Sequence, residues 1–230
     1  MSKETKEARE ILISIDELES RVAVLEGGRL LEIYISREER QVGSIYKGKV
    51  TNVLPGMQAA FVDIGLERNA FLCVDDVSAR LGTEEVIDEI KEFSIKDMLK
   101  VNQESPVQIV KESIGGKGAR VTTHITLPGR YLVFLPTARY IGISRRIDDE
   151  EERNRLRLMV EKIKPRNMGV IVRTAAEGRD VDDLKKDLEF LTRLWDKIQT
   201  SAKRKKAPAL IHQELALVYK TVILRCVPTE

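Results

Sequence analysis

Residues 44–72 place two phenylalanines and two lysines among short strands and turns. Phe61 lies between Ala60 and Val62, and side chains alternate across a strand, so a core that takes Ala60 and Val62 leaves Phe61 on the outer face. Phe71, on the next strand, can lie on that same face. Bases of single-stranded nucleic acid stack on such rings with roughly 1 to 3 kcal/mol each, and nearby lysines neutralise phosphates. The pattern favours a nucleic-acid platform, although aromatic side chains at this spacing are also often packed in a core.

A second candidate is the glycine-rich loop SIGGKG over residues 113–118. Its glycines let the backbone approach a ligand closely, and Lys117 offers a point charge to a phosphate. The spacing lacks the Walker pattern of nucleotide triphosphate sites, and no strand-to-helix context follows. A plain hairpin loop is the alternative interpretation.

The third candidate is the pair Arg173 and Thr174, which directly follows the apolar segment GVIV. Ligands bind beyond the carboxyl ends of strands in α/β sheets. A guanidinium can make bidentate bonds to phosphate oxygens, and a hydroxyl adds one more directed bond. The pair therefore predicts a phosphate site, with an ordinary salt bridge of the arginine as the alternative.

The elements that would position these residues fall into three groups along the chain. Residues 10–15, 20–25 and 29–35 predict an antiparallel meander with a glycine turn between the last two strands. Residues 46–50, 59–64, 69–72, 107–111 and 119–123 supply five strands, enough for an OB-type barrel, with a mixed, partly helical segment over 73–98. From residue 128 the pattern alternates, with strands at 130–135, 141–146 and 169–173, helices at 148–163 and 180–202, and a short strand or turn at 210–214. Trp195 lies on the apolar stripe of the second helix, which predicts a core position.

Composition adds limits on the class of protein. The 230 residues predict two or three modules, and 39 basic against 37 acidic residues leave any nucleic-acid binding to local patches. Cys73 and Cys226 lie far apart without a CxxC motif, which argues against a zinc site and a disulfide scaffold. No apolar run reaches membrane-spanning length, and the polar opening segment is unlike a secretory signal, so we expect a soluble cytoplasmic protein.

Several segments together resemble the N-terminal part of the RNase E/G family of bacterial endoribonucleases. IYKGKVTNVLPGMQAAFVDIGLERNAFL is similar to the family's S1 RNA-binding domain, and GKGARVTTHITLPGRYLVFLP, GISRRI, GVIVRTAAEG and LIHQE resemble its sensor of RNA 5′ ends. The resemblance implies an α+β multidomain fold, in which an OB-fold (S1-type) β-barrel is inserted into an RNase H-like segment and followed by an α/β 5′-sensor subdomain. We expect an RNase H-like piece over 1–39, the S1 domain over 40–123, the 5′ sensor over 124–216 and the start of a second RNase H-like piece over 217–230.

The resemblance also implies roles for individual residues. Positions that hold single-stranded RNA in the family's S1 domain correspond to Phe61, Phe71 and Lys117. Positions of the 5′-phosphate pocket correspond to Arg173 and Thr174, while those that contact the terminal nucleotide of a 5′-monophosphorylated RNA correspond to Gly129 and Val133. A pocket shaped for one phosphate would discriminate sterically against a 5′-triphosphate.

Catalysis is not assigned to any residue of this sequence. By resemblance, the family's magnesium-binding aspartates and its zinc-linking cysteines would come after Glu230, so Mg²⁺ and Zn²⁺ are expected only for that C-terminal part. Asp63, Asp75, Asp76, Asp182 and Asp183 fit turns or helix starts better than a two-metal site. Whether the chain is an enzyme is left open, and we expect no cleavage by this chain alone.

The sequence thus predicts the RNA-binding, 5′-monophosphate-sensing portion of an RNase E/G-type endoribonuclease that acts in RNA processing and decay. The expected partner is single-stranded RNA with a 5′-monophosphate, and the resemblance implies a homo-oligomer for a full-length enzyme. Two alternatives stay open. One is a working nuclease with an unrecognised metal site, and the other is a non-catalytic RNA-binding regulator or protein-interaction adaptor.

Overall fold

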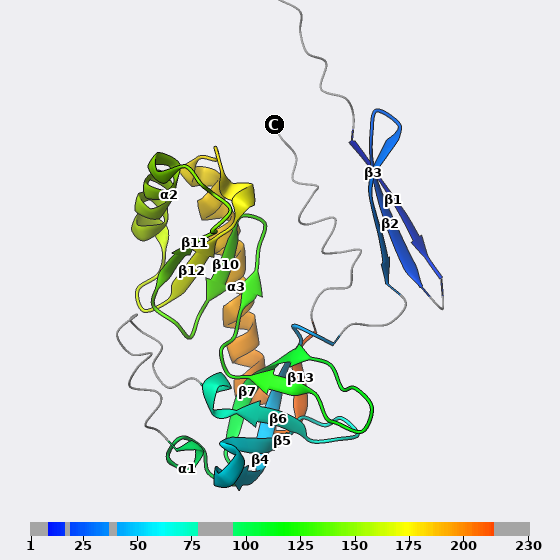
Figure 1. The fold of residues 1–230 in the computed structure, drawn as a ribbon, viewed down its shortest axis with the longest axis vertical. Helices are drawn as coiled ribbons and strands as arrows, with labels where there is room; N and C mark the ends of the chain where they lie inside the picture. Colours follow the sequence, from blue (N-terminus) through cyan, green and yellow to red (C-terminus); the bar gives the residue numbers. More distant parts are fainter. Residues whose placement is uncertain (1–8, 17–18, 37–40, 78–93, 214–230) are drawn as a thin grey trace, which may run out of the picture. The chain divides into compact units, whose positions relative to one another are not determined.

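The computed structural model describes residues 9–16, 19–36, 41–77 and 94–213. The chain divides into two compact units, one formed by Met1–Arg40 with Glu214–Glu230 and the other by Gln41–Gln213 (Figure 1). Each unit is described by itself below.

The first unit contains a three-stranded antiparallel sheet of β1 (Arg9–Ile15), β2 (Ser20–Glu26) and β3 (Arg29–Ser36) in the order β1-β2-β3. Gly27 and Gly28 form the turn between β2 and β3 with φ values of 56° and 76°, which only glycine adopts readily. The predicted meander is therefore confirmed. Within the described residues, Val22 and Val24 are buried, whereas Leu12, Ile13, Ile15, Leu30, Leu31, Ile33 and Ile35 are exposed.

The second unit begins with a closed five-stranded barrel. Its strands are β4 (Ile45–Leu54), β5 (Ala59–Asp63), β6 (Ala70–Cys73), β7 (Glu104–Lys111) and β8 (Arg120–Thr122). They follow the order β4-β5-β6-β8-β7, and β7 also pairs with β4, which closes the sheet on itself. The OB-type barrel predicted from the five strand patterns is confirmed.

Small residues let the barrel close tightly. Gly48 lies in β4 where a Cβ would come 2.4 Å from Val62 Cγ1, so a side chain there would displace the core. The β4–β5 turn is a 3-10 turn, Pro55–Met57, which ends at Gln58 with a φ of 47°. Gln58 also accepts a hydrogen bond from Ile95 N at the start of α1 (Ile95–Met98), and residues 78–93 of the predicted mixed segment lie outside the described residues.

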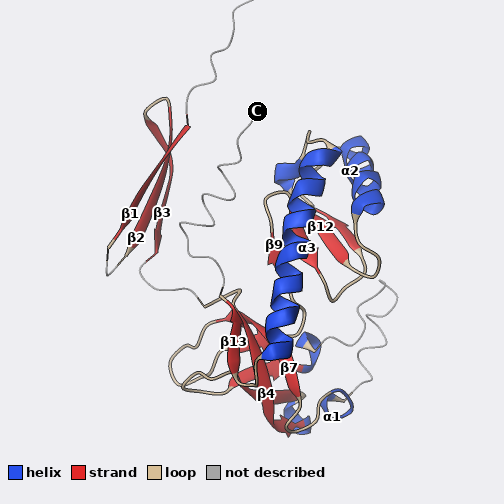
Figure 2. Ribbon diagram, turned by 180° about the vertical axis from the view of Figure 1, so that it is seen from behind, coloured by secondary structure: helices blue, strands red, loops and turns tan. Residues whose placement is uncertain are grey.

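An α/β part follows the barrel. Its sheet contains β9 (Leu127–Pro128), β10 (Leu132–Leu135), β11 (Ile141–Ile143) and β12 (Gly169–Val172) in the order β11-β12-β10-β9. Only the β11–β12 pair is parallel among the pairs of this sheet. The helices are α2 (Glu150–Ile163) and α3 (Val181–Arg204), and Figure 2 shows α3 running along this sheet.

Both helices begin where an aspartate accepts a hydrogen bond from a first-turn N–H. Asp149 accepts from Glu151 N, and Asp180 accepts from Asp183 N. The apolar stripe predicted for the second helix is buried in one core with the sheet, including Leu184, Leu188, Leu191, Trp195 and Ile198. Trp195 is therefore a core residue, as predicted.

The last described strand, β13 (Ala209–His212), pairs antiparallel with β4 and adds a sixth strand to the barrel sheet. Lys47 on β4 supports the same junction, because its Nζ donates to Lys205 O at 2.9 Å and forms an ion pair of 2.9 Å with Glu104. The pattern of residues 210–214 predicted a short strand or turn; the structure shows a strand, and the pattern did not indicate this partner. No helix within the described ranges is long and apolar enough to span a membrane.

Candidate nucleic-acid interface

Phe61 and Phe71 lie directly opposite each other on neighbouring strands of the barrel. Their ring centroids are 6.1 Å apart and the ring planes are inclined at 70°, an edge-to-face pair. The flanking side chains of Ala60 and Val62 are buried, whereas both phenylalanines are half-buried on the outer face. The structure thus supports the outward orientation that strand alternation predicted. Rings in this arrangement present two π surfaces that point in different directions.

The same cross-strand row continues beyond the rings to two cations. Arg120 on β8 is the partner of Phe71, and Lys111 on β7 is the partner of Arg120. On the other side, Asn52 on β4 is the partner of Phe61. The row therefore runs from an amide through two aromatic rings to two positive charges. The sequence did not single out Arg120 or Lys111, because the register of the parallel β6–β8 pair cannot be derived from strand patterns.

Arg120 is held in place by Asp76. The guanidinium donates from Nε at 2.8 Å and from Nη2 at 2.6 Å to Asp76 Oδ2, and this contact raises the pKa of Arg120. Asp76 O in turn accepts from the hydroxyls of Thr122 and Thr123. The side chain of Arg120 is 42% exposed, which leaves part of the guanidinium open to solvent.

Lys117 is exposed in the turn between β7 and β8, where residues Ile114 and Lys117 form an antiparallel bridge. The turn is packed against the segment that leads into β6. Arg68 Nη1 donates to Gly116 O at 2.6 Å, and a Cβ on Gly118 would lie 2.0 Å from Asn69 O. This packing places the turn beside the start of the strand that carries Phe71. Contact of Lys117 with RNA stays a prediction.

The second candidate site lies where β12 ends. Arg173 and Thr174 come directly after Val172, and Val172 pairs with Leu132 at the start of β10. Arg173 N donates to Tyr131 O at 2.8 Å, and Arg173 Nη1 donates to Gly129 O at 2.5 Å. In the described part of the chain, the guanidinium is thus bonded to a backbone carbonyl rather than to a carboxylate. A guanidinium has five N–H donors, so this contact leaves others for a ligand.

The structure brings Gly129, Val133, Arg173 and Thr174 to one edge of the α/β sheet. Gly129 lies in the β9–β10 turn, where its N–H donates to Leu132 O at 2.8 Å. Val133 pairs with Ile171, and both side chains are half-buried, whereas their neighbours Leu132 and Val172 are buried in the core shared with α2 and α3. Because residues two apart on a strand share a face, Arg173 emerges on the same face as Ile171 and Val133, opposite the helices.

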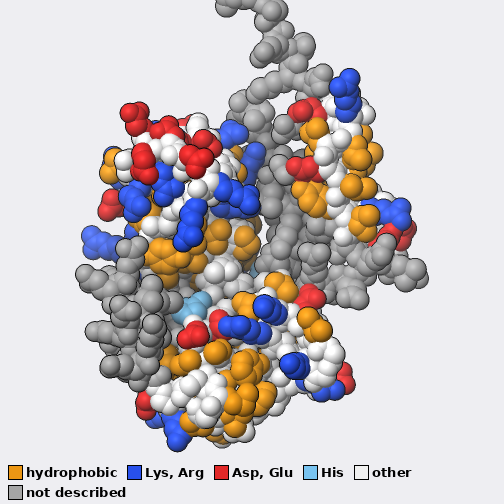
Figure 3. Space-filling view, viewed as in Figure 1, with side chains coloured by type: hydrophobic (Ala, Val, Ile, Leu, Met, Phe, Trp, Pro, Cys, Tyr) orange, Lys and Arg blue, Asp and Glu red, His pale blue; other side chains and the backbone are white. Residues whose placement is uncertain are grey.

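Further basic side chains surround this edge. Arg145 and Arg146 are exposed just beyond β11, which runs parallel to β12, so both strands end at the same edge. Arg130 and Arg179 lie over the ring of Tyr131, with guanidinium carbons 5.0 and 5.7 Å from its centroid. In the view of Figure 3, Lys and Arg side chains gather across the middle of the α/β part, below a group of Asp and Glu side chains. The arginines in the sequence segments GISRRI and PGRY could have indicated Arg145, Arg146 and Arg130 as candidate basic residues.

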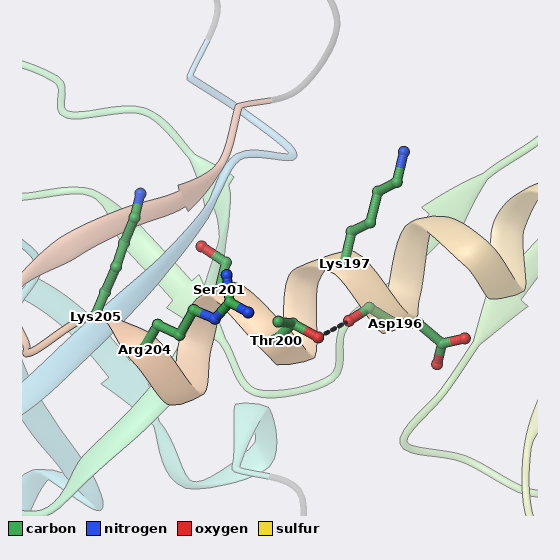
Figure 4. A pocket seen from close by; sticks show the side chains of 6 residues that line it. All are labelled: Asp196, Lys197, Thr200, Ser201, Arg204 and Lys205. Carbon is green, nitrogen blue, oxygen red and sulfur yellow. Dashed lines mark hydrogen bonds between the residues drawn. The ribbon is translucent and has the colours of Figure 1, made fainter.

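An open pocket of about 480 Å³ lies along the end of α3. It is lined by Asp196, Lys197, Thr200, Ser201, Arg204 and Lys205 (Figure 4). Thr200 Oγ1 donates to Asp196 O, and Lys205 Nζ donates to Leu210 O at 2.6 Å. None of the predicted site residues lines this pocket.

The acidic residues have structural roles in the described ranges. Asp63 accepts from Gly65 N in a turn, Asp76 pairs with Arg120, and Asp182 and Asp183 lie in the first turn of α3. No group of three or more His, Cys, Asp or Glu residues that could hold a metal ion occurs among the residues that the structure describes. His124 lies beside Asp75, with His124 Nε2 3.2 Å from Asp75 O, and burial lowers the pKa of His124.

Comparison with known proteins agrees with both parts of the second unit. Residues 39–123 match the S1 RNA binding domain, and residues 126–227 match the Ribonuclease E/G family. The chain is 47% identical over 219 residues to Ribonuclease G of Salmonella typhimurium (strain SL1344) and 46% identical to Ribonuclease G of Escherichia coli (strain K12). Each alignment covers 93% of this chain and 44% of the relative.

Ribonuclease E of Nostoc sp. (strain PCC 7120 / SAG 25.82 / UTEX 2576) is 43% identical over 204 residues, covering 88% of this chain and 29% of the relative. The chain therefore spans less than half the length of these curated relatives. The match extends through the barrel with its half-buried, outward-facing aromatic pair and through the α/β part with its basic sheet edge. On these findings the chain belongs to the ribonuclease E/G family and carries an S1 RNA binding domain.

Proposed function

We propose that this chain is the RNA-binding, 5′-monophosphate-sensing portion of an endoribonuclease that acts in cytoplasmic RNA processing and decay. The observation that carries the proposal is Arg173 with Thr174 at the end of β12, where the guanidinium donates to Gly129 O and two exposed arginines, Arg145 and Arg146, follow the neighbouring parallel strand. A planar guanidinium beside a hydroxyl suits phosphate, because the guanidinium can donate two parallel hydrogen bonds to its oxygens and the hydroxyl can donate a third. Assembly into a homo-oligomer is proposed only for the full-length enzyme.

In this proposal the two sites hold different parts of one RNA. Bases stack on Phe61 and Phe71, and Lys117, Arg120 and Lys111 neutralise the phosphates that follow. The terminal phosphate binds Arg173 and Thr174. The first nucleotide lies along the face of Val133 and against the backbone of the turn at Gly129.

We expect this site to favour one phosphate because Arg173 makes two bonds to the β9–β10 turn, one from its backbone N–H and one from its guanidinium. The bond from Nη1 to Gly129 O restrains the guanidinium against swinging outward to follow a longer chain of phosphates. Binding of a 5′-triphosphate is therefore disfavoured sterically, whereas a 5′-hydroxyl loses the charge-assisted bonds.

The test compares Arg173→Ala with the unmodified chain on one short RNA that carries either a 5′-monophosphate or a 5′-hydroxyl. We expect the variant to lose roughly tenfold or more in affinity for the monophosphate, the scale of a lost hydrogen bond to a charged group, and to bind the hydroxyl RNA normally. Arg157→Ala, at an exposed position of α2, is the matched control for removing one positive charge. Equal losses on both RNAs would refute sensing by Arg173.

Binding that is indifferent to both Arg173 and the aromatic pair would instead favour an adaptor that contacts protein. The same purified chain, incubated with RNA and magnesium, would reveal an unrecognised catalytic site if shortened products accumulate.

A further inference from the structure

Asp187 on α3 accepts three hydrogen bonds from consecutive backbone N–H groups of the β9–β10 turn. Oδ1 accepts from Arg130 N at 3.1 Å, and Oδ2 accepts from Tyr131 N at 2.8 Å and from Leu132 N at 3.0 Å. The donors lie 55 to 57 residues away in the sequence. One carboxylate thus fixes the backbone of the whole turn.

The turn is shaped to admit this carboxylate. A Cβ on Gly129 would lie 2.6 Å from both carboxylate oxygens, so any larger residue at this position would push Asp187 out of its place. The requirement for glycine comes from the approach of the carboxylate rather than from an unusual backbone angle. Gly129 and Asp187 therefore fit together as a pair.

The same turn is the support of the proposed phosphate-binding arginine. Arg173 is bonded to it at two points, from its backbone N–H to Tyr131 O and from its guanidinium to Gly129 O. Asp187 thus holds the turn through its N–H groups, while Arg173 is held through the carbonyl groups of Gly129 and Tyr131, which belong to two of the same peptide units. A change in the turn that follows loss of Asp187 moves both acceptors of Arg173.

We infer that Asp187 is a positioning residue for the 5′-phosphate site, an inference that rests on the proposed function. Consecutive backbone N–H groups form a concavity that binds anions. The carboxylate of Asp187 occupies this concavity from the helix side, so the turn is ordered before RNA arrives. The incoming phosphate is left to Arg173 and Thr174, and Asp187 itself does not contact RNA.

The test is Asp187→Asn, which keeps the shape of the side chain but offers one carbonyl oxygen and turns an NH₂ group toward backbone donors. We expect the affinity for 5′-monophosphorylated RNA to fall roughly tenfold, on the scale of hydrogen bonds to a charged group, with the affinity for 5′-hydroxyl RNA unchanged. The ratio of the two affinities is the measured quantity, because partial unfolding lowers both in equal proportion. Asp196→Asn, at an exposed position of the same helix, is the control.

Arg173→Ala in the same experiment separates the inference from the proposed function. If Arg173→Ala loses the preference and Asp187→Asn keeps it, the positioning role is wrong and the sensing function stands. If Arg173→Ala keeps the preference, the sensing function itself fails. Equal losses on both RNAs in Asp187→Asn would mean that Asp187 only stabilises the fold, and would overturn the inference.

A second pair of variants tests the fit between Asp187 and the turn even if Asp187→Asn folds poorly. Gly129→Ala should lower the monophosphate preference in the parent chain, because the new methyl group meets the carboxylate. In an Asp187→Ala background, Gly129→Ala should cause little further loss. If Gly129→Ala lowers the monophosphate preference as much in the Asp187→Ala background as in the parent chain, Gly129 and Asp187 are not coupled.

Discussion

Replacing Phe61 or Phe71 with alanine tests the barrel platform most sharply. The rings are edge-to-face at 6.1 Å with planes inclined at 70°, so they cannot both lie flat against one base. Each ring is expected to stack on a different base, at roughly 1 to 3 kcal/mol of binding free energy per ring. A loss of about 1.4 kcal/mol is a tenfold change in affinity, so each single variant should weaken RNA binding by roughly 5-fold to 150-fold.

The geometry also predicts how the two losses combine. Separate bases mean that the double variant should lose close to the sum of the two binding free energies, within about 0.5 kcal/mol. Stability behaves differently, because the ring pair itself contributes roughly 0.5 to 1.5 kcal/mol to the fold and is lost once in either variant. In the parent chain, the two single variants and the double variant, the losses in binding free energy should therefore add, whereas the losses in the free energy of unfolding should not.

The assay is fluorescence anisotropy with a labelled single-stranded RNA, repeated at several salt concentrations. The slope of log affinity against log salt should not change in the phenylalanine variants, because the number of neutralised phosphates is the same. Phe190→Ala, an exposed ring on α3 that is 41% accessible, is the matched control. Wild-type affinity in either single variant, or strong non-additivity in binding, would refute separate stacking on the two rings.

Three other changes have defined outcomes. Lys117→Ala should reduce the steepness of the salt dependence by about 0.7, the value for one phosphate contact on a single strand, and an unchanged slope would exclude a phosphate contact. Gly48→Ala should lower the free energy of unfolding by roughly 1 to 3 kcal/mol through the overpacked contact with Val62, measured by urea denaturation; wild-type stability would contradict this packing. Arg155 donates to both carboxylate oxygens of Glu152 and lowers the pKa of Glu152 to about 2 from 4.5. A carboxyl group whose pKa is lower in the folded protein than in the unfolded chain stabilises the fold at pH values above its unfolded pKa, so the free energy of unfolding should fall as the pH drops from about 4.5 toward 2. Glu152→Gln should lower the free energy of unfolding at neutral pH by about 1 kcal/mol or less and should flatten its dependence on pH. If the variant keeps the full pH dependence, other groups cause it.

Features that depend on local pattern were predictable from the sequence. The alternation of Ala60, Phe61 and Val62 was enough to place one ring outside the barrel, because the period of a strand is fixed at two residues. The apolar spacing of α3 was enough to place Trp195 in the core. Arg173 could be placed at the end of a buried strand because it directly follows an uninterrupted apolar run.

Features that depend on contacts between distant segments were not predictable. The pairing of β13 with β4 joins residues more than 150 positions apart, and nothing in the apolar pattern of either strand specifies the other. The row from Phe71 to Arg120 depends on the register of a parallel pair, which many sequences satisfy equally well. In the sequence Asp187 is one of several acidic residues of α3, and only the structure shows that its carboxylate accepts hydrogen bonds from the β9–β10 turn.

The measurement that tests the central claim most directly is the affinity of the unmodified chain for one RNA sequence bearing a 5′-monophosphate, a 5′-hydroxyl or a 5′-triphosphate. Salt concentration is held fixed, since affinities for nucleic acid are comparable only at one ionic strength. The account predicts that the monophosphate RNA binds most tightly, and that both other ends bind more weakly. Equal affinity for all three RNAs would contradict 5′-end sensing and leave only the single-strand binding of the barrel.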